Sequence, residues 1–126
     1  MGRVMLDSSV VIASLKESDI HHKSAKNALL AADHEYCMSA ITVSEVLVQY
    51  AASRDFGRIS ATLLESIPTV FEVNTDIAVA SARVRYAQKL KTPDAIISAT
   101  AKAHSAELWT FDRKLAKAHK GAVLLK

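Results

Sequence analysis

The sequence predicts an α/β fold in which a parallel sheet of about five short strands is covered by helices on both faces, a three-layer α/β/α arrangement. Short apolar segments typical of buried strands alternate with longer segments whose apolar residues recur at helical spacing. The connections between them are short, which for parallel strands implies right-handed crossovers. The length of 126 residues suits one domain, so we expect a single domain over residues 1–126.

The first half of the chain contains the first two strands. We expect strands at residues 3–7 and 35–39, because both are short, apolar and bounded by polar residues. Ser8 or Ser9 is expected to cap a helix ending at Leu15, and Ser18 or Asp19 to open a second helix. The apolar face predicted for that second helix consists of Ile20, Ala25, Ala28, Leu29 and Ala32.

The middle of the chain predicts two more helices and a strand. Thr42 is expected to begin an amphipathic helix that stops near Gly57. A further helix, which Pro68 closes, carries an apolar stripe, and residues 70–73 form the next strand. The stripe consists of Ile59, Leu63, Leu64 and Ile67.

The last third repeats the alternation. Thr75 is expected to cap a helix running to about Leu90, and Thr92 to cap a helix running to about His104, with Pro93 in its first turn. Strands are predicted at residues 107–111 and 122–125, separated by a short helix at 112–118 that stops near Gly121.

Composition excludes several classes of protein. Half of the residues are hydrophobic, with only three Gly and two Pro, which argues against a disordered chain. Cys37 is the only cysteine, so no intrachain disulfide can form and a reducing cytoplasm is expected. Residues 1–6 do not read as a signal peptide or a membrane span. The net charge of +3 suits a polyanionic partner but is too small to establish one.

Four acidic residues lie where the predicted fold would bring them together. Asp7 ends the first strand and Asp112 follows the fourth, and in an open parallel sheet the carboxyl ends of strands share one edge. Glu45 and Asp94 lie in the first turns of helices that can begin over that edge. Two carboxylates about 4 Å apart repel by roughly 4 kcal/mol at an effective dielectric near 20, so such a cluster calls for a bound cation. Mg²⁺ prefers these oxygen ligands and can activate water for phosphodiester hydrolysis.

Each acid also has a simpler explanation. Residues 42–45 match a capping box, in which Glu45 would only bond back to the start of its helix. Asp94 and Asp112 are favoured near helix N-termini by the helix dipole. Asp7 is the hardest to explain in this way, because a carboxylate directly after a buried strand needs a partner. Ser8 and Thr110 are candidate supporting hydroxyls. The five histidines lack metal-ligand spacing, and there is no phosphate-binding glycine loop or nucleophile elbow.

Four blocks of the sequence, taken together, resemble the PIN-domain nucleases, and among them the VapC-type toxins of toxin–antitoxin modules. The blocks span most of the chain, and each contains one of the acids. They are residues 4–12 (VMLDSSVVI), 39–47 (SAITVSEVL), 92–101 (TPDAIISATA) and 109–115 (WTFDRKL).

The resemblance implies a single PIN-like nuclease domain with Asp7, Glu45, Asp94 and Asp112 around Mg²⁺ or Mn²⁺, and Ser8 and Thr110 beside them. It also implies endonucleolytic cleavage of RNA, a homodimer, and a VapB-type antitoxin as partner. We expect phosphates to be held by four basic residues that lie near Asp94 and Asp112 in the sequence. These are Arg83, Arg85, Lys91 and Arg113.

Three alternatives remain open on the sequence. The first is a housekeeping PIN-type nuclease that processes RNA. The second is a non-catalytic RNA-binding member of the family. The third is a receiver-like module that accepts a phosphoryl group, although such a module needs a pair of acids after its first strand, where Asp7 is followed by Ser8 and Ser9.

Overall fold

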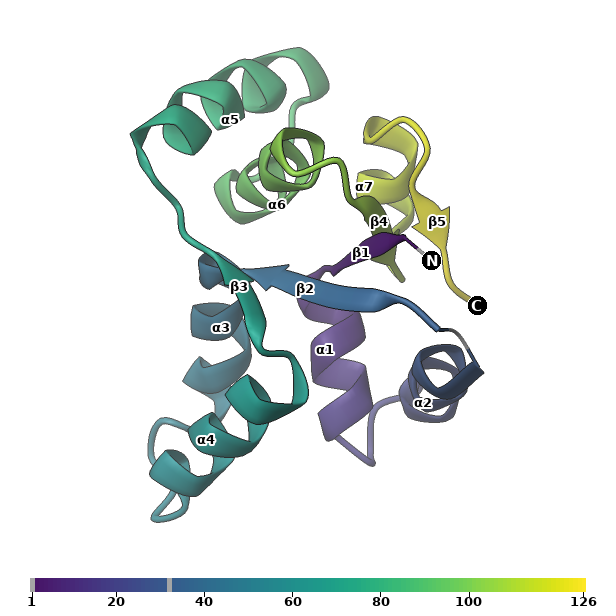
Figure 1. Cartoon of the computed structure of the whole chain (residues 1–126), viewed down its shortest axis with the longest axis vertical. Helices are drawn as coiled ribbons and strands as arrows, with labels where there is room; N and C mark the ends of the chain where they lie inside the picture. Colours follow the sequence, from purple (N-terminus) through teal and green to yellow (C-terminus); the bar gives the residue numbers. More distant parts are fainter. Residues whose placement is uncertain (1, 32) are drawn as a thin grey trace.

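The sheet has five parallel strands and helices on both faces (Figure 1), which confirms the predicted α/β class. The computed structural model describes residues 2–31 and 33–126. The strand order is β3-β2-β1-β4-β5. The strands are β1 (Arg3–Leu6), β2 (Glu35–Ser39), β3 (Thr69–Phe71), β4 (Glu107–Thr110) and β5 (Val123–Leu124).

Two layers of helices cover the sheet. In Figure 1, α1 to α4 lie below it and α5 to α7 above it. The lower helices are α1 (Ser8–Leu15), α2 (His22–Ala31), α3 (Ala40–Leu47) and α4 (Phe56–Ser66), with a short 3₁₀ turn η1 (Val48–Tyr50) before α4. The upper helices are α5 (Thr75–Gln88), α6 (Thr92–Ala103) and α7 (Arg113–Ala118).

Side chains alternate between two hydrophobic cores, one on each face of the sheet. Val4 and Leu6 of β1 pack with α1, α3 and α4, whereas Met5, between them, packs with α6 and α7. This alternation is the period-2 geometry of a strand, and both sets of neighbours are apolar because a central parallel strand is buried on both faces. Cys37 of β2 is buried in the upper core.

The order of the strands indicates where in the sheet a ligand site is expected. From β1 the chain adds β2 and then β3 on one side, and it later returns to add β4 and β5 on the other side. The strand order therefore reverses between β1 and β4, and in open parallel sheets the crevice at the carboxyl ends of such strands is the usual ligand site. Asp7 follows β1 and Thr110 ends β4 at this edge of the sheet.

Two local predictions were wrong. The second helix starts at His22 rather than at Ser18 or Asp19, so Ile20 lies in the preceding turn and is 91% exposed instead of buried. Gly57 does not stop a helix, because α3 ends at Leu47 and Gly57 lies in the first turn of α4. Ala32, assigned to the same face as Ile20, lies outside the described residues.

The helix caps also differ from the prediction. The caps are Asp7 for α1, Ser39 for α3 and Asn74 for α5, one or more residues before the predicted ones. The predicted cap residues themselves have helical backbone geometry. The last strand and the end of α7 lie close to their predicted positions. Gly121, near which that helix was expected to stop, has a φ of 85° in the turn before β5. In residues 2–31 and 33–126, no helix combines the length and apolar character that crossing a bilayer requires.

Candidate active site

Asp7 is held rigidly at the end of β1. Its Oδ1 accepts hydrogen bonds from the Ser9 hydroxyl at 2.6 Å and the Val10 amide at 3.2 Å, while its Oδ2 accepts from the Thr110 hydroxyl at 2.6 Å. The residue is only 3% exposed. Burial raises the pKa of Asp7, and the hydrogen bonds from Ser9 and Thr110 oppose that increase because they stabilise the carboxylate.

Thr110 links Asp7 to the start of α7. Its Oγ1 donates to Asp7 and accepts from the Asp112 amide at 2.9 Å, so one buried hydroxyl serves both acidic positions. Asp112 caps α7, with its Oδ1 accepting from the Lys114 and Leu115 amides. The capping explanation of Asp112 is therefore correct as far as Oδ1 is concerned. The Asp112 residue is otherwise exposed.

Glu45 points to α1 rather than back along its own helix. Its Oε1 accepts a hydrogen bond from the Ser8 hydroxyl at 2.5 Å. The capping-box interpretation is wrong, because the α3 cap is Ser39, whose hydroxyl accepts from the Ile41 amide at 3.2 Å. Thr42, the predicted partner in that box, is buried, and its Oγ1 lies 3.4 Å from the Ser8 hydroxyl. Ser8 thus supports Glu45 in the way that Thr110 supports Asp7.

Asp94 shows that the four acids share one electrostatic environment. It is the third residue of α6 and is half-buried. Burial is the largest cause that raises its pKa to about 6, followed by the negative charges of Asp112, Asp7 and Glu45. Lys91, just before the helix, acts in the opposite direction. Since charges from three other elements act on this carboxyl group, the fold brings all four predicted acids to one edge of the sheet.

The donor atoms suit a hard divalent cation in kind. Four carboxylates from separate elements supply the oxygen ligands that Mg²⁺ and Mn²⁺ prefer, and their mutual repulsion is the electrostatic cost that a cation removes. Within residues 2–31 and 33–126, no three acidic, His or Cys side chains already converge as a metal-binding group. The oxygens of Asp7 and Glu45 are instead engaged by neighbouring hydroxyl groups. The metal and the roles of these acids remain predictions.

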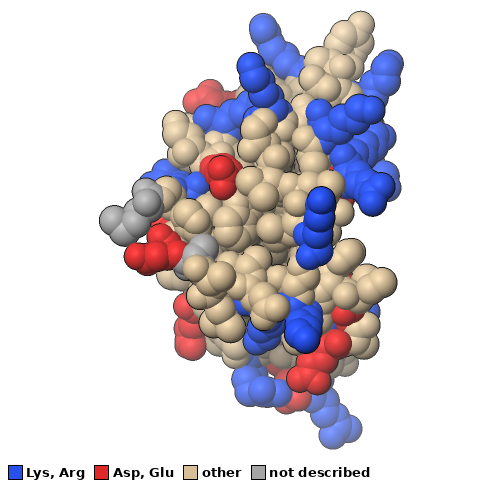
Figure 2. Space-filling view, turned by 90° about the vertical axis from the view of Figure 1, so that its right-hand side faces the viewer, with Lys and Arg blue, Asp and Glu red and all other residues tan. Residues whose placement is uncertain are grey.

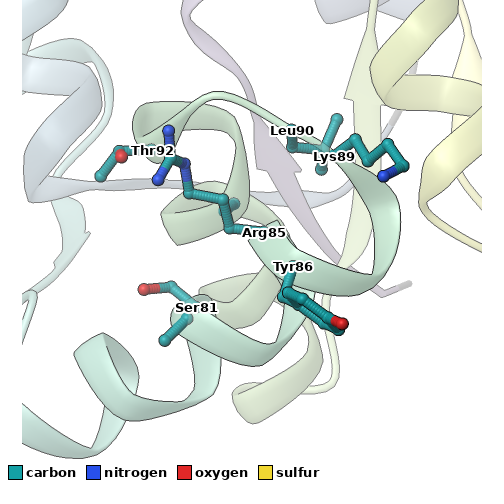
Figure 3. Close-up of a pocket in the computed structure, with 8 residues that line it drawn as sticks. Ser81, Arg85, Tyr86, Lys89, Leu90 and Thr92 are labelled. Carbon is teal, nitrogen blue, oxygen red and sulfur yellow. The ribbon is translucent and has the colours of Figure 1, made fainter.

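The predicted RNA-binding residues are divided by the fold. Lys91 and Arg113 are exposed and sit beside Asp94 and Asp112 in the chain. Arg85 is exposed on α5 and lines a groove that reaches Thr92 and Ala95 at the start of α6 (Figure 3). Arg83 is exposed on α5 but does not line this groove, because side chains two residues apart leave a helix on nearly opposite sides.

Sequence reasoning missed the role of Ser9. It was considered only as a helix cap, yet its hydroxyl donates to Asp7 and accepts from the Phe111 amide at 3.1 Å. A possible signal was the pair of serines directly after Asp7, since hydroxyl groups beside a buried carboxylate are natural donors to it. The buried pair Ser98 and His119 was also missed. The Ser98 hydroxyl lies 2.7 Å from Nδ1 of His119, which joins α6 to the C-terminal end of α7.

The sequence matches the family model described as PIN domain over residues 4–121. The chain belongs to the PIN-domain family. A toxin–antitoxin complex from Klebsiella pneumoniae contains a similar chain, with 32% identity, 95% of each chain covered and a TM-score of 0.80. FitAcB from Neisseria gonorrhoeae is 25% identical over 95% of each chain, with a TM-score of 0.75.

A third similar structure agrees with this PIN domain in fold alone. VapC20 from Mycobacterium tuberculosis, described as a Sarcin-Ricin loop cleaving toxin, is 16% identical over 98% of each chain, with a TM-score of 0.78. A comparison with the curated proteins found no match. The family assignment rests on the family model and on the Klebsiella pneumoniae relative, and both cover the segments that contain the four acids.

Proposed function

We propose that this PIN domain is a metal-dependent endoribonuclease that acts as the toxin of a toxin–antitoxin pair. One observation carries the catalytic part of the proposal, namely that the negative charges of Asp7, Glu45 and Asp112 all act on Asp94. Carboxyl groups whose pKa is raised by burial and by neighbouring negative charges gather at catalytic sites. The relatives support the toxin part, since one belongs to a toxin–antitoxin complex and another is described as a Sarcin-Ricin loop cleaving toxin.

The four acids would hold Mg²⁺ or Mn²⁺. When bound, such an ion activates a water molecule for attack on the phosphodiester and neutralises the charge that develops on the phosphate. Asp7 contributes a carboxylate whose orientation is fixed by Ser9 and Thr110. Asp94 must lose its proton to bind a cation, and with a pKa of about 6 in the metal-free protein the cation affinity should fall as the pH drops below about 6.

Basic residues at the rim of the site would position the RNA. Lys91 precedes α6 and Arg113 follows Asp112, so both place a positive charge at the edge of the acidic crevice. These charges suit the phosphates on either side of the cleaved bond and do not depend on the base sequence. They also lower the electrostatic cost of bringing a polyanion to a site that carries four carboxylates.

An apolar groove in the lower layer of helices, on the face of the sheet opposite α6 and α7, is a candidate binding site for a protein partner. Side chains of α1, α2 and α4 line it, and the exposed Leu30 stands at its edge. An amphipathic antitoxin helix that inserts apolar residues into this groove is the occupant we propose, because the relatives include complexes of toxin with antitoxin. The lining includes Leu15, Leu29, Leu30, Leu63 and Ile67. The homodimer and the cytoplasmic location remain predictions from the resemblance and from composition.

The nuclease proposal is tested by removing single charges. Asp7→Asn and Asp94→Asn should each reduce cleavage of total RNA by about 100-fold or more, because each variant loses a group that stabilises charge in the reaction. Asp76→Asn, an exposed acid in the first turn of α5, is the matched control and should cut like the wild type. Cleavage is measured with Mg²⁺, Mn²⁺ or EDTA, and the new ends are mapped.

The outcomes of this experiment separate the proposals. Cleavage by Asp7→Asn that equals wild-type cleavage, or cleavage that persists in EDTA, would contradict a metal-dependent site built on these acids. Circular dichroism of each variant shows whether the fold is retained.

The toxin role has its own test. A small reading frame beside the gene should encode a protein that copurifies with this chain and suppresses its cleavage. If no such neighbour exists and the chain is harmless on expression, the housekeeping nuclease is the better assignment.

A further inference from the structure

Helix α7 depends on tertiary contacts for its position. It spans only six residues, about 9 Å, and a helix this short is not stable by itself in water. Its outward side chains are exposed and basic, and in Figure 2 basic side chains crowd the upper part of the displayed face, at the height of α5 to α7. These outward residues are Arg113, Lys114 and Lys117. Because solvated side chains do not hold a helix in place, the inner face and the two ends of α7 must do so.

One buried polar contact joins the end of α7 to the middle of α6. The Ser98 hydroxyl lies 2.7 Å from Nδ1 of His119, and the two residues are 1% and 5% exposed. It is the one side-chain hydrogen bond between α6 and α7 in the part of the chain that the structure describes. Leu115 supplies the apolar part of the inner face of α7, since it is buried in the upper core together with Ile97 of α6.

Stability alone does not require a hydroxyl group and an imidazole ring at this position. Replacing both partners of a buried hydrogen bond by apolar groups of the same shape can leave the free energy of unfolding nearly unchanged. A hydrogen bond differs from an apolar contact because it has a preferred length and direction. The contact of Ser98 with His119 therefore selects one arrangement of α6 and α7, where an apolar contact would tolerate small shifts of one helix along the other.

The arrangement that this contact fixes is that of two acids. Asp94 lies four residues before Ser98, one turn earlier on the same side of α6. Asp112 caps the end of α7 that is opposite His119, and the Asp112 amide donates to Thr110 Oγ1. Helix α7 is thus anchored to β4 at its start and to α6 at its end. Without the second anchor it could pivot about the first, which would turn the Asp112 carboxylate relative to Asp94.

We propose that Ser98 and His119 are positioning residues that set the relative orientation of Asp94 and Asp112, and thereby the affinity of the acidic site for a divalent cation. The inference rests on the proposed metal-dependent function and adds to it two residues that lie outside the group of acids. Functional side chains have to be held within about 0.5 Å and roughly 10–20° of their productive geometry. A small rotation of α7 is therefore enough to weaken cation binding.

Binding of Mn²⁺ in the absence of RNA tests the proposal. Electron paramagnetic resonance detects the unbound ion, so a titration gives the dissociation constant. Ser98→Ala should raise this constant about 10-fold, the lower end of the effect of removing groups that orient metal ligands. Ser98→Ala/His119→Leu leaves no polar group unpaired at this contact, so it should fold and should raise the constant by as much. His119→Asn keeps a polar atom close to the position of Nδ1 and should bind Mn²⁺ like the wild type.

Thr100→Val is the matched control. Thr100 is a buried residue of α6, and its hydroxyl donates to the Ile96 carbonyl of the same helix at 2.6 Å. The variant removes a hydroxyl group from α6 without changing the contact with α7. Its Mn²⁺ dissociation constant should therefore equal that of the wild type, whatever its stability.

Two results would overturn the proposal and leave the proposed function intact. One is wild-type Mn²⁺ affinity of the double variant, measured on protein that circular dichroism shows to be folded. The other is an equal loss of affinity in Thr100→Val and Ser98→Ala, since any lost hydroxyl group of α6 would then loosen the site. Failure of the wild type itself to bind Mn²⁺ would contradict the proposed function together with this inference.

Discussion

At the scale of single residues, the acidic site depends on hydroxyl groups as much as on carboxylates. Asp7 is buried and accepts hydrogen bonds from two of them, and Glu45 accepts one from Ser8. These donors stabilise negative charge that burial would otherwise disfavour. Burial and the charges of the other three acids all act on Asp94, so its protonation depends on the charge state of the whole site.

Replacing Asp94 should stabilise the protein in the absence of metal. Its pKa rises from 3.8 in the unfolded chain to about 6 in the folded one, so the folded state binds the proton first. The stability that comes from that proton is complete below pH 3.8 and is lost as the pH rises through 6. Asp94→Asn should therefore increase the free energy of unfolding by about 1–2 kcal/mol at pH 7.5 in EDTA, an amount reduced for solvent screening.

Urea unfolding at two pH values checks this prediction. The increase in the free energy of unfolding should shrink to a small fraction near pH 4, where Asp94 of the folded wild type is largely protonated. Asp76→Asn, away from the acidic cluster, should show no such pH-dependent gain. If Asp94→Asn were equally or less stable than the wild type at pH 7.5, the neighbouring charges would not be repelling one another as described.

At the scale of elements, polar contacts at the ends of helices fix how the upper layer is assembled. Asp112 caps the start of α7, and His119 at its other end contacts Ser98 in the middle of α6. Asp94 lies one turn before Ser98 on the same side of α6. The contact between Ser98 and His119 therefore helps to hold the two helices that carry Asp94 and Asp112 in a fixed relation.

Ser98→Ala should reduce the free energy of unfolding by about 1–3 kcal/mol. The variant leaves Nδ1 of the buried His119 without its partner, and an unsatisfied buried polar group costs about that much. Burial lowers the pKa of His119, so the unfolded chain binds a proton first and stability falls as the pH drops below about 6.5. Measurement at pH 7.5 keeps the ring neutral.

Ser60→Ala is the matched control for this variant. The Ser60 hydroxyl donates only to the Phe56 carbonyl of its own helix at an exposed position, and its loss should change stability by less than about 0.5 kcal/mol. Equal effects of the two alanine variants in urea unfolding would show that the contact between α6 and α7 is not a stabilising one.

At the scale of the whole molecule, the sheet separates two surfaces of different character. The layer of α5, α6 and α7 is basic and borders the acidic crevice, while the layer of α1 to α4 carries the apolar groove. A substrate with many phosphates and a protein partner with an apolar helix can therefore bind to different faces. The four acids lie at the sheet edge between these layers, since Asp7 and Glu45 come from the lower layer and Asp94 from the upper.

Basic residues of the upper layer should govern the salt dependence of RNA binding. Lys91→Ala and Arg113→Ala should each weaken binding and reduce the slope of log K against log salt by about 0.7, because each removes one phosphate contact. Lys16→Ala and Lys23→Ala remove equal charges from the lower layer and should leave the slope unchanged. Binding is followed by anisotropy in EDTA between 50 and 200 mM salt. Equal slopes for all four variants would mean that RNA binding depends only on the net charge of the protein.

The sequence by itself determined the kind of each element and the identity of the acids. Short apolar runs bounded by polar residues placed the five strands, because such a run is a local property of the chain. They also placed Asp7 and Asp112 at strand ends, so a shared edge followed from parallel pairing alone. Boundaries were less well predicted. The exposure of Ile20 and the caps of α1, α3 and α5 depend on where the backbone turns, which neighbouring packing decides.

Only the tertiary structure decided which groups meet. The sequence left open whether Glu45 caps its own helix or belongs to the acidic site, and its contact with Ser8 depends on the packing of α3 beside α1. The pairing of Ser98 with His119 likewise joins residues whose proximity has no local signature. Strand order and helix packing set these distances, and both result from burying two hydrophobic faces at once rather than from any single segment.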